Sequence, residues 1–272
     1  MSEHCKVSVI IPCFNHGEFL PEAVASATTT RREDVELIVV DDGSADERTR
    51  HEMAKVAAQG IRVIRQENKG LAAARNAGIS VSTGDYILPL DADNRLRPAY
   101  IEHGIRILDG DPTVGVVYGD AQRFGKYTGH WKLGRFDLCR LLDCNFIDAC
   151  AMYRRAVWDQ NGGYDGTMPM QGFEDWDFWI GAVENGWQFA YVPEILFEYR
   201  TAEESMLARA LPFQKAIGEF ICRKHALLYH EQFARMFTER LSIKLTARRL
   251  FELIELRLKR RLRTTVRNGR EV

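Results

Sequence analysis

Five short apolar runs alternate with helical segments through the first 118 residues of the chain. The runs are rich in β-branched residues, and they are apolar at nearly every position instead of every second one. They span residues 7–11, 35–40, 61–64, 86–88 and 114–118. Strands covered by helices on both faces have this pattern. The sequence therefore predicts an α/β fold with a Rossmann-like, mostly parallel sheet and helices on both faces.

Polar residues follow three of these runs. Asn15 comes after the first, Asp41 and Asp42 end the second, and Asp91 and Asp93 come after the fourth. Ligands of open α/β sheets bind beyond the carboxyl ends of the strands, so we expect these side chains to share one edge. Carboxylates gathered there repel one another unless a cation or hydrogen-bond donors offset the charge.

Asp91 and Asp93 flank Ala92 at the end of a buried strand. Hard carboxylate oxygens suit Mg²⁺ or Mn²⁺, and Mg²⁺ needs only one or two of them when substrate phosphates and water complete its shell. Aspartate is also an ordinary turn residue, which gives an alternative without metal. The position at a strand end favours the metal site.

The residues after the first two runs could contact a nucleotide. Asp42 can accept hydrogen bonds from a base or a ribose, and Phe14 can present its ring to a base or pack in the core. Ser44, with Glu47 three residues later, has the pattern of a capping box. We therefore expect Ser44 to cap the next helix, while the aspartates face a ligand or serve as caps themselves.

Two further segments carry candidate groups. Lys69 and Arg75 are candidate partners of phosphate or base, although a surface lysine and a salt-bridged arginine fit equally well. The small residues around them allow a helix to lie close to the sheet or to a ligand. Residues 174–177 place acids among aromatic side chains, where burial raises the pKa of a carboxyl and its basicity. The alternative is a helix start that favours acids.

Taken together, these segments resemble the family-2 inverting glycosyltransferases, which have the GT-A fold. The matching segments occur in the family's order and are residues 7–15, 39–44, 68–78, 84–93, 161–165 and 174–177. The resemblance implies a GT-A domain over residues 1–204, with a nucleotide-binding half at about 1–118 and an acceptor half at about 119–204. It implies synthesis of a polysaccharide, glycolipid or other cell-surface glycan from a nucleotide-diphosphate sugar, most often a uridine one.

The resemblance also implies roles for individual residues. Asp175 would be the catalytic base, with Glu174 and Trp176 on the acceptor side, and the product anomer would be inverted. Asp91 and Asp93 would bind Mn²⁺ or Mg²⁺, with Asp93 nearer the diphosphate. The donor side would comprise Pro12, Phe14, Asn15, Asp41, Asp42, Lys69, Gly70, Arg75, Asp91 and Ala92.

The chain departs from the family after the pair Tyr199-Arg200. Many members carry a histidine there, and the corresponding residue of this chain is Ala202. His225 or His230 could replace that histidine only if the C-terminal segment folds back.

The C-terminal segment differs from the rest in charge. Residues 205–272 contain 16 Lys and Arg and 6 Asp and Glu, a net charge of +10 against −11 for the remainder. We predict a basic helical extension over this range. Its arginines either dock on an anionic membrane near a lipid-linked acceptor or lie in solvent on a helical lid or an oligomer contact.

Several classes of protein fit the sequence poorly. A dehydrogenase needs a G-x-G-x-x-G loop after the first strand, and a sugar-phosphate nucleotidyltransferase needs a basic, glycine-rich one. Residues 12–15 provide neither. A sugar-nucleotide-binding module or polymerase subunit without its own activity remains an alternative, against which Asp91, Asp93 and Asp175 argue. We expect no nucleic-acid partner.

The cysteines and apolar runs bear on the compartment. Six cysteines without a C-x-x-C pair indicate reduced thiols. No apolar run approaches the roughly 20 residues needed to span a bilayer, and the N-terminus lacks signal-peptide anatomy. We therefore expect a cytoplasmic protein, at the inner face of the membrane if the tail docks there.

Overall fold

The computed structural model describes residues 5–29, 32–203 and 206–241. The chain divides into two compact units, the first ending at His225 and the second beginning at Ala226. In the second unit, residues 226–241 are helical, which agrees with the helical extension predicted from the sequence. The limits 1–204 for a GT-A domain stay a prediction.

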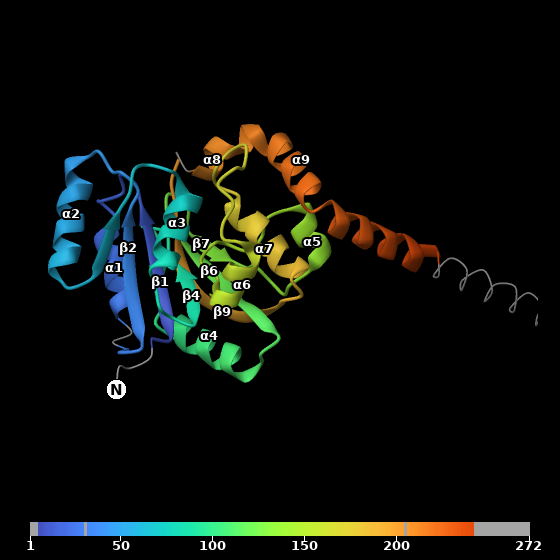
Figure 1. Ribbon diagram of the computed structural model, residues 1–272, viewed down its shortest axis with the longest axis horizontal. Helices are drawn as coiled ribbons and strands as arrows, with labels where there is room; N and C mark the ends of the chain where they lie inside the picture. Colours follow the sequence, from blue (N-terminus) through green and yellow to red (C-terminus); the bar gives the residue numbers. More distant parts are fainter. Residues whose placement is uncertain (1–4, 30–31, 204–205, 242–272) are drawn as a thin grey trace, which may run out of the picture. The chain divides into compact units, whose positions relative to one another are not determined.

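The first unit is built on one nine-stranded mixed sheet within the described residues (Figure 1). The main path runs in the order β3-β2-β1-β4-β8-β6-β9-β5, and β7 pairs with β6. The strands are β1 (Val7–Cys13), β2 (Val35–Asp41), β3 (Arg62–Arg65), β4 (Tyr86–Pro89), β5 (Arg95–Leu96), β6 (Val114–Gly125), β7 (Gly129–Trp131), β8 (Met152–Arg154) and β9 (Gln188–Thr201).

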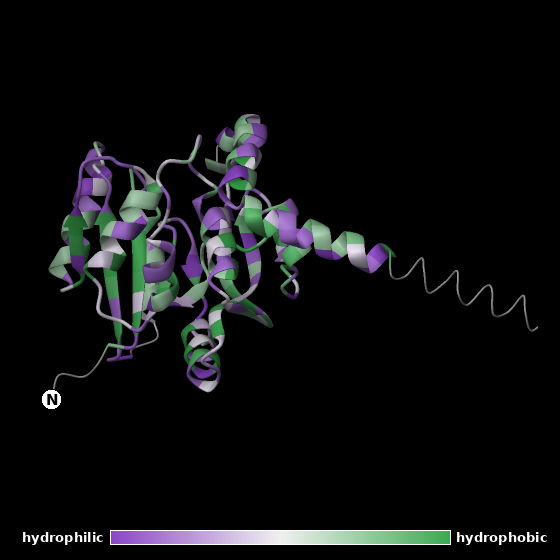
Figure 2. Ribbon diagram, turned by 45° about the vertical axis from the view of Figure 1, so that its right-hand side comes forward, coloured by the Kyte–Doolittle hydropathy of each residue, from purple (hydrophilic) through white to green (hydrophobic). Residues whose placement is uncertain are grey.

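The half of the sheet that holds β3, β2, β1 and β4 is parallel throughout. The register pairs Val7 with Val35 on one side of β1 and with Tyr86 on the other. Figure 2 shows these strands as hydrophobic along most of their length. Each of the five apolar runs predicted as strands matches a strand, namely β1 to β4 and β6, and only Ile61 falls outside, directly before β3.

The other half of the sheet is mixed. β8 is antiparallel to both β4 and β6, while β6 and β9 are parallel, with register shifts next to Asp120. β9 continues beyond its pairing with the start of β6 to Thr201, so that it also reaches β5.

Helices cover both faces of the parallel half. Alternate residues of β1 point to opposite faces: Val9 and Ile11 belong to the core cluster with residues of α1 and α4, whereas Ile10 meets α3 at Gly78. The helices are α1 (Leu20–Thr28), α2 (Glu47–Ala58), α3 (Leu71–Ser80), α4 (Ala99–Gly110), α5 (Leu138–Asp143), α6 (Arg155–Asn161), α7 (Glu174–Glu184), α8 (Met206–Ala210) and α9 (Gln214–Lys224), with a 3₁₀ turn η1 (Leu211–Phe213).

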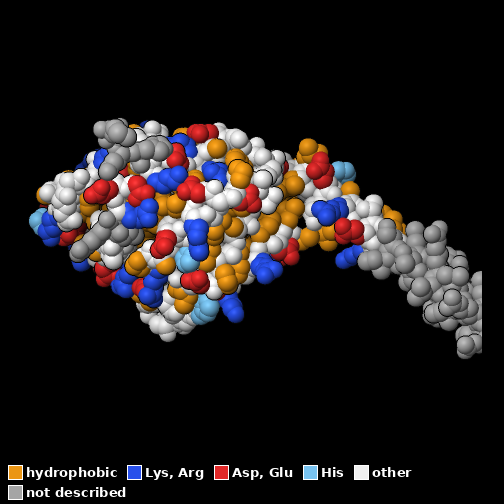
Figure 3. All heavy atoms as spheres, turned by 90° about the horizontal axis from the view of Figure 1, so that it is seen from below, with side chains coloured by type: hydrophobic (Ala, Val, Ile, Leu, Met, Phe, Trp, Pro, Cys, Tyr) orange, Lys and Arg blue, Asp and Glu red, His pale blue; other side chains and the backbone are white. Residues whose placement is uncertain are grey.

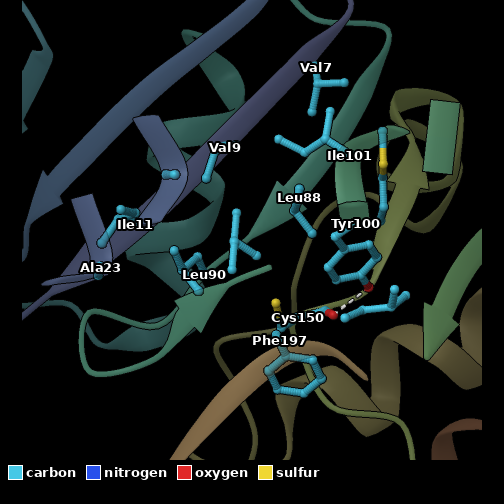
Figure 4. Close-up of a cluster of buried hydrophobic side chains, with 14 of the residues drawn as sticks. Val7, Val9, Ile11, Ala23, Leu88, Leu90, Tyr100, Ile101, Cys150 and Phe197 are labelled. Carbon is cyan, nitrogen blue, oxygen red and sulfur yellow. Dashed lines mark hydrogen bonds between the residues drawn. The ribbon is translucent and has the colours of Figure 1, made fainter. Parts of the chain in front are cut away.

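A buried hydrogen bond lies within the apolar core between the two halves of the sheet. The hydroxyl of Tyr100, on α4, donates to the carbonyl oxygen of Cys150 at 2.6 Å. Figure 4 shows this bond beside Leu88 and Phe197. It satisfies the buried hydroxyl and holds the segment before β8 against α4.

The predicted cap of α2 is wrong. Asp46 is the N-cap residue, and its Oδ1 accepts from the backbone N–H of Thr49 at 2.8 Å. Ser44 lies earlier in the turn, where its hydroxyl oxygen accepts from the backbone N–H of Asn15 at 3.0 Å. Ser44 therefore joins the ends of β1 and β2 instead of starting the helix.

No helix among the described residues is both long and apolar enough to cross a membrane.

Candidate active site

The carboxyl ends of β1, β2 and β4 meet at one edge of the sheet, as predicted. Cys13 pairs with Asp41 in the register, and its carbonyl oxygen accepts from the backbone N–H of Asp42 at 2.9 Å. On the other side of β1, Ile10 accepts from the backbone N–H of Leu90 at 2.9 Å. Asp91 follows the end of β4 after Leu90, so these acids come from neighbouring strands.

Asp42 is buried and gathers three hydrogen bonds. Its Oδ1 accepts from Gln66 Nε2 at 2.7 Å and from the backbone N–H of Lys69 at 2.9 Å, and its Oδ2 accepts from the backbone N–H of Gly70 at 2.9 Å. Gly70 has a φ of +89°, a conformation that side chains rarely tolerate. Asp42 therefore fixes the loop in front of α3.

Asn15 and Asp41 shape the turn between β2 and α2. Asn15 adopts a left-handed φ of +54°, and its Oδ1 accepts from the backbone N–H of Ala45 at 2.9 Å. The Oδ1 of Asp41 accepts from the backbone N–H of Ser44 at 2.8 Å. Both side chains hold backbone at the predicted donor edge.

Phe14 stands out because its ring is 43% exposed, whereas the preceding residues of β1 are buried. Pro12 belongs to that buried strand. An exposed aromatic ring beside a polar strand edge is suited to stacking on a planar ligand. The side chain of Lys69 is also exposed.

Arg75 is the cationic centre of the site. It is 1% exposed, and it donates from Nη1 to Glu174 Oε1 at 2.6 Å and from Nη2 to Asp91 Oδ1 at 2.8 Å. Burial opposes its charge, but the carboxylates of Asp91 and Glu174 raise its pKa. Its Nε is buried without a hydrogen-bond partner among the described residues. Arg75 thus joins α3, the end of β4 and α7.

Asp93, two residues after Asp91, is the acid of this edge whose negative charge is disfavoured. Burial and, after it, the neighbouring Asp91 raise its pKa to about 6. Electrostatic interactions with His16 and Arg200 act in the opposite direction. Arg200 donates from Nε to the carbonyl oxygen of Asp93 at 3.0 Å, and its guanidinium lies 4.3 Å from the ring centre of Phe19.

The residues present fit a divalent cation bound together with substrate. Within the described residues, no group of three or more His, Cys, Asp or Glu side chains is arranged to hold a metal. Mg²⁺ commonly takes only one or two protein carboxylates and completes its shell with phosphates and water. Burial and the neighbouring Asp91 raise the pKa of Asp93 by disfavouring its negative charge, and a cation there would offset that charge.

Asp175 lies in the first turn of α7 and is 8% exposed. Burial and the adjacent Glu174 raise its pKa to about 8. Its Oδ1 accepts from the backbone N–H of Trp176 at 2.9 Å. The Trp176 indole is buried and donates from Nε1 to the carbonyl oxygen of Leu141 at 2.6 Å, so it holds α5 against α7.

Asp148 was not predicted from the sequence. Burial and then Asp91 raise its pKa to about 7, and Asp93 acts in the same direction. Its Oδ1 accepts from the backbone N–H of Cys150 at 2.9 Å. It is a single acid in a segment without clear periodicity, and no local motif marks it. Only the pairing of β8 with β4 brings it to the other acids.

His225 does not occupy the place of the missing histidine after Tyr199-Arg200. It is bound to Asp177 and Glu184 on α7. His230 lies in the second unit. Of the histidines in the first unit, His16 acts electrostatically on Asp93. Its position two residues after Phe14 gave no sign of this in the sequence.

Comparison with known proteins shows similarity to glycosyltransferases. The family model described as glycosyl transferase family 2 matches residues 8–168. The glycosyltransferase GlyG of Streptococcus pneumoniae is 34% identical over 126 residues, which are 44% of this chain and 42% of GlyG. The putative glycosyltransferase EpsH of Bacillus subtilis is 34% identical over 120 residues, which are 43% of this chain and 34% of EpsH.

Solved structures share the fold. Residues 1–349 of S. aureus TarS, in complex with UDP-GlcNAc, superpose with a TM-score of 0.60 at 18% identity, covering 75% of this chain and 60% of that fragment. The mannosyltransferase PcManGT from Pyrobaculum calidifontis, in complex with GDP-Man and Mn²⁺, gives 0.60 at 19% identity, covering 77% of this chain and 61% of PcManGT. The predicted GT-A fold is confirmed. This chain spans less than two thirds of the length of each of these proteins.

Proposed function

The chain belongs to glycosyl transferase family 2, and from this premise we propose that it transfers a sugar from a nucleotide diphosphate to an acceptor hydroxyl. We take the base to be uridine and the transfer to invert the anomeric carbon. The acceptor belongs to a polysaccharide, glycolipid or other cell-surface glycan.

One observation carries this proposal, namely the concentration of carboxylates around a single buried arginine. Arg75 binds Asp91 and Glu174 directly, and the pKa values of three further acids are raised by burial. These acids are Asp93, Asp148 and Asp175. Uncompensated buried charge is costly, so a site of this kind is built for a cationic or proton-donating partner.

The donor nucleotide would lie along the edge formed by β1 and β2. The exposed ring of Phe14 offers a stacking surface, and Asp42 fixes the backbone of Lys69 and Gly70 beside it. Asn15 and Asp41 hold the intervening turn. Pro12, Ala92 and the side chain of Lys69 complete this proposed donor side.

Asp93, with Asp91, would hold Mn²⁺ or Mg²⁺ against the diphosphate. When bound, the cation supplies Lewis-acid stabilisation of the charge on the leaving group. Asp91 is also the partner of Arg75. The contact with Arg75 orients the carboxylate of Asp91 and occupies its Oδ1.

Asp175 would act as the general base. A carboxyl with a pKa of about 8 is a far stronger base than an exposed aspartate. It would take the proton from the acceptor hydroxyl while that oxygen attacks the anomeric carbon opposite the diphosphate. Glu174 would serve the acceptor side mainly by holding Arg75, and Trp176 by anchoring α7 on Leu141.

The test is a donor screen with the full chain and Mn²⁺, in which release of the free nucleotide is measured for UDP-, GDP- and TDP-sugars. We expect one UDP-sugar to be turned over and Asp175→Asn to bind it without turnover. Binding without turnover by the wild type would favour a sugar-nucleotide-binding module. The absence of binding across the series would contradict the proposal.

We also propose a peripheral contact of the second unit with anionic membrane at the cytoplasmic face. Its helix exposes Phe233, Met236, Phe237 and Leu241 at helical spacing, and Phe233 and Phe237 stack at 6.4 Å between ring centres. Figure 3 shows hydrophobic side chains among charged ones on this helix. An amphipathic helix of this kind, within a C-terminal segment whose sequence carries an excess of Lys and Arg, suits the headgroup region of an anionic bilayer.

Co-sedimentation with phosphatidylglycerol vesicles tests the contact. Replacing Phe233 and Phe237 by Ser should release the full chain from the vesicles, whereas Tyr127→Ser, at an aromatic residue that is 60% exposed elsewhere, should not. Equal binding by all variants would exclude this helix as the contact, and no binding by the wild type would favour an oligomer interface.

A further inference from the structure

A second cluster of charged side chains lies on α7 away from Arg75. α7 presents Asp175 and Asp177 two residues apart, so at about 100° per residue the two side chains point roughly 200° apart. Asp175 belongs to the acidic group near Arg75, whereas Asp177 contacts the end of α9. One helix thus carries the candidate base on one face and an ionic contact on the opposite face.

The contact with α9 is made by two consecutive residues. Lys224 Nζ donates to Asp177 Oδ2 at 2.8 Å and to Asp165 Oδ2 at 2.7 Å. His225 lies 3.0 Å from Asp177 Oδ1 through Nε2 and 2.7 Å from Glu184 Oε2 through Nδ1. Both oxygens of Asp177 are therefore engaged.

Burial separates this cluster from ordinary surface ion pairs. Asp177 is 4% exposed and His225 is 3% exposed. Asp177 and Glu184 are seven residues apart on α7, so they lie on one face two turns apart. His225 contacts both, which aligns the end of α9 along α7.

The charge of His225 follows from its partners. An imidazole can donate from both ring nitrogens only as the imidazolium ion. Burial opposes that charge, but the contacts with Asp177 and Glu184 raise the pKa of His225 above its ordinary 6.5. Lys224 and Asp165 also face the cluster, with opposite charges. The contacts with Asp177 and Glu184 therefore favour the imidazolium form of His225.

We propose that Asp177, Lys224 and His225 form a latch that positions α7 and, through it, the carboxylate of Asp175. These would be positioning residues, because Lys224 and His225 contact α7 at Asp177, on the face opposite Asp175. The effect of the latch on turnover rests on the function proposed above. Its effect on the stability of α7 does not, because that depends only on the contacts with α9.

The test uses Lys224→Met and His225→Gln in the full chain, with Lys224→Arg as the variant that keeps the charge. Lys55→Met is the matched control, because Lys55 makes an exposed pair with Glu52 on α2, 2.7 Å long. Hydrogen exchange of the α7 amides is measured together with kcat, KM and the Kd for UDP in Mn²⁺.

We expect α7 exchange to accelerate at least about tenfold in Lys224→Met and His225→Gln, and to stay near the wild-type rate in Lys224→Arg and Lys55→Met. Misplacement of Asp175 should lower kcat by roughly 10- to 100-fold, while the Kd for UDP stays within about twofold. In the wild type, the exchange of α7 should also accelerate by more than the pH dependence of intrinsic amide exchange as the pH rises through the raised pKa of His225. His225→Gln should lack this additional increase.

Unchanged α7 exchange in both latch variants would overturn the proposal. Faster exchange with unchanged kcat would overturn the positioning of Asp175. If the wild-type chain turns over no nucleotide sugar, the proposed function fails with the catalytic effect of the latch, and the exchange measurement still decides whether α9 holds α7.

Discussion

Arg75 on α3 donates to Asp91 at the end of β4, with 2.8 Å between Nη2 and Oδ1. Because the same guanidinium binds Glu174 on α7, it ties the parallel half of the sheet to the helix that carries the candidate base. Arg75 is almost completely buried, so its charge and those of its partners depend on one another.

The first prediction concerns the removal of this charge. Arg75→Met leaves the buried Glu174 and the adjacent Asp91 without their cation. Removing one partner of a buried ion pair costs about 3–5 kcal/mol. We expect a loss of that order in the free energy of unfolding, measured by urea denaturation at neutral pH. Arg65→Met is the control, because the side chain of Arg65 is 56% exposed and lies 3.5 Å from Asp41; it should change stability by less than about 1 kcal/mol.

The second prediction concerns the close approach of α3 to the sheet. A Cβ at Gly78 would lie 2.5 Å from Ile10 Cγ2 and 3.0 Å from Val40 Cγ2. Gly78→Ala should therefore destabilise the chain by about 1–3 kcal/mol through overpacking, again in urea denaturation. Gly110→Ala, where a Cβ meets nothing within 4 Å, should be neutral or slightly stabilising. Equal effects of the two changes would contradict the packing argument.

The parallel half of the fold could be predicted because its signals are local. Its strands are short and mostly apolar, and the carboxyl ends of parallel strands share an edge. That rule was sufficient to bring Asp42 and Asp91 to the same edge from the sequence alone. The small residues around Gly78 likewise indicated the close packing of α3.

The other half could not be predicted because its contacts are not local. β8 is only three residues long and inserts antiparallel between β4 and β6, a pairing that no periodicity reveals. Asp148 reaches the site only through that insertion. Ser44 was predicted as a cap from a valid pattern, but Asp46 lies closer to the helix and forms the cap instead. The contact of His225 with Asp177 spans 48 residues and has no sequence motif.

The third prediction concerns the metal site. Asp93→Asn keeps the size of the side chain but removes the charge expected to face the cation. Loss of one electrostatic contact of this kind typically costs about 3 kcal/mol, or roughly 100-fold in rate. We expect kcat/KM in Mn²⁺ to fall by that factor and the affinity for Mn²⁺ in the presence of UDP to weaken in calorimetry. Glu47→Gln, an exposed carboxylate on α2, is the control, and the same loss in both variants would argue against a metal role for Asp93.

The fourth prediction follows from the raised pKa of Asp175. The base must be ionised to accept a proton, so kcat/KM should increase with pH and level off above about 8. This increase is measured as kcat/KM from pH 6 to pH 9, with the donor identified in the screen. An activity already constant from pH 6 upward would mean that Asp175 is ionised throughout and does not titrate as the base.

The last prediction separates the effect of the Asp175 carboxylate on stability from its proposed role in catalysis. The folded-state pKa of Asp175, about 8, lies above the ordinary value of 3.8. Between these two values the folded state binds more protons at this group than the unfolded state, so its contribution to stability falls as pH rises. Asp175→Asn cannot ionise and avoids that loss. The variant should therefore be inactive yet melt higher than the wild type at pH 8.5, by about 2–4 °C for each kcal/mol gained, and the difference should shrink towards pH 4. The difference in Tm is measured by thermal unfolding monitored with circular dichroism at both pH values, with Glu47→Gln as the control. A difference in Tm that is the same at both pH values would come from packing and not from ionisation.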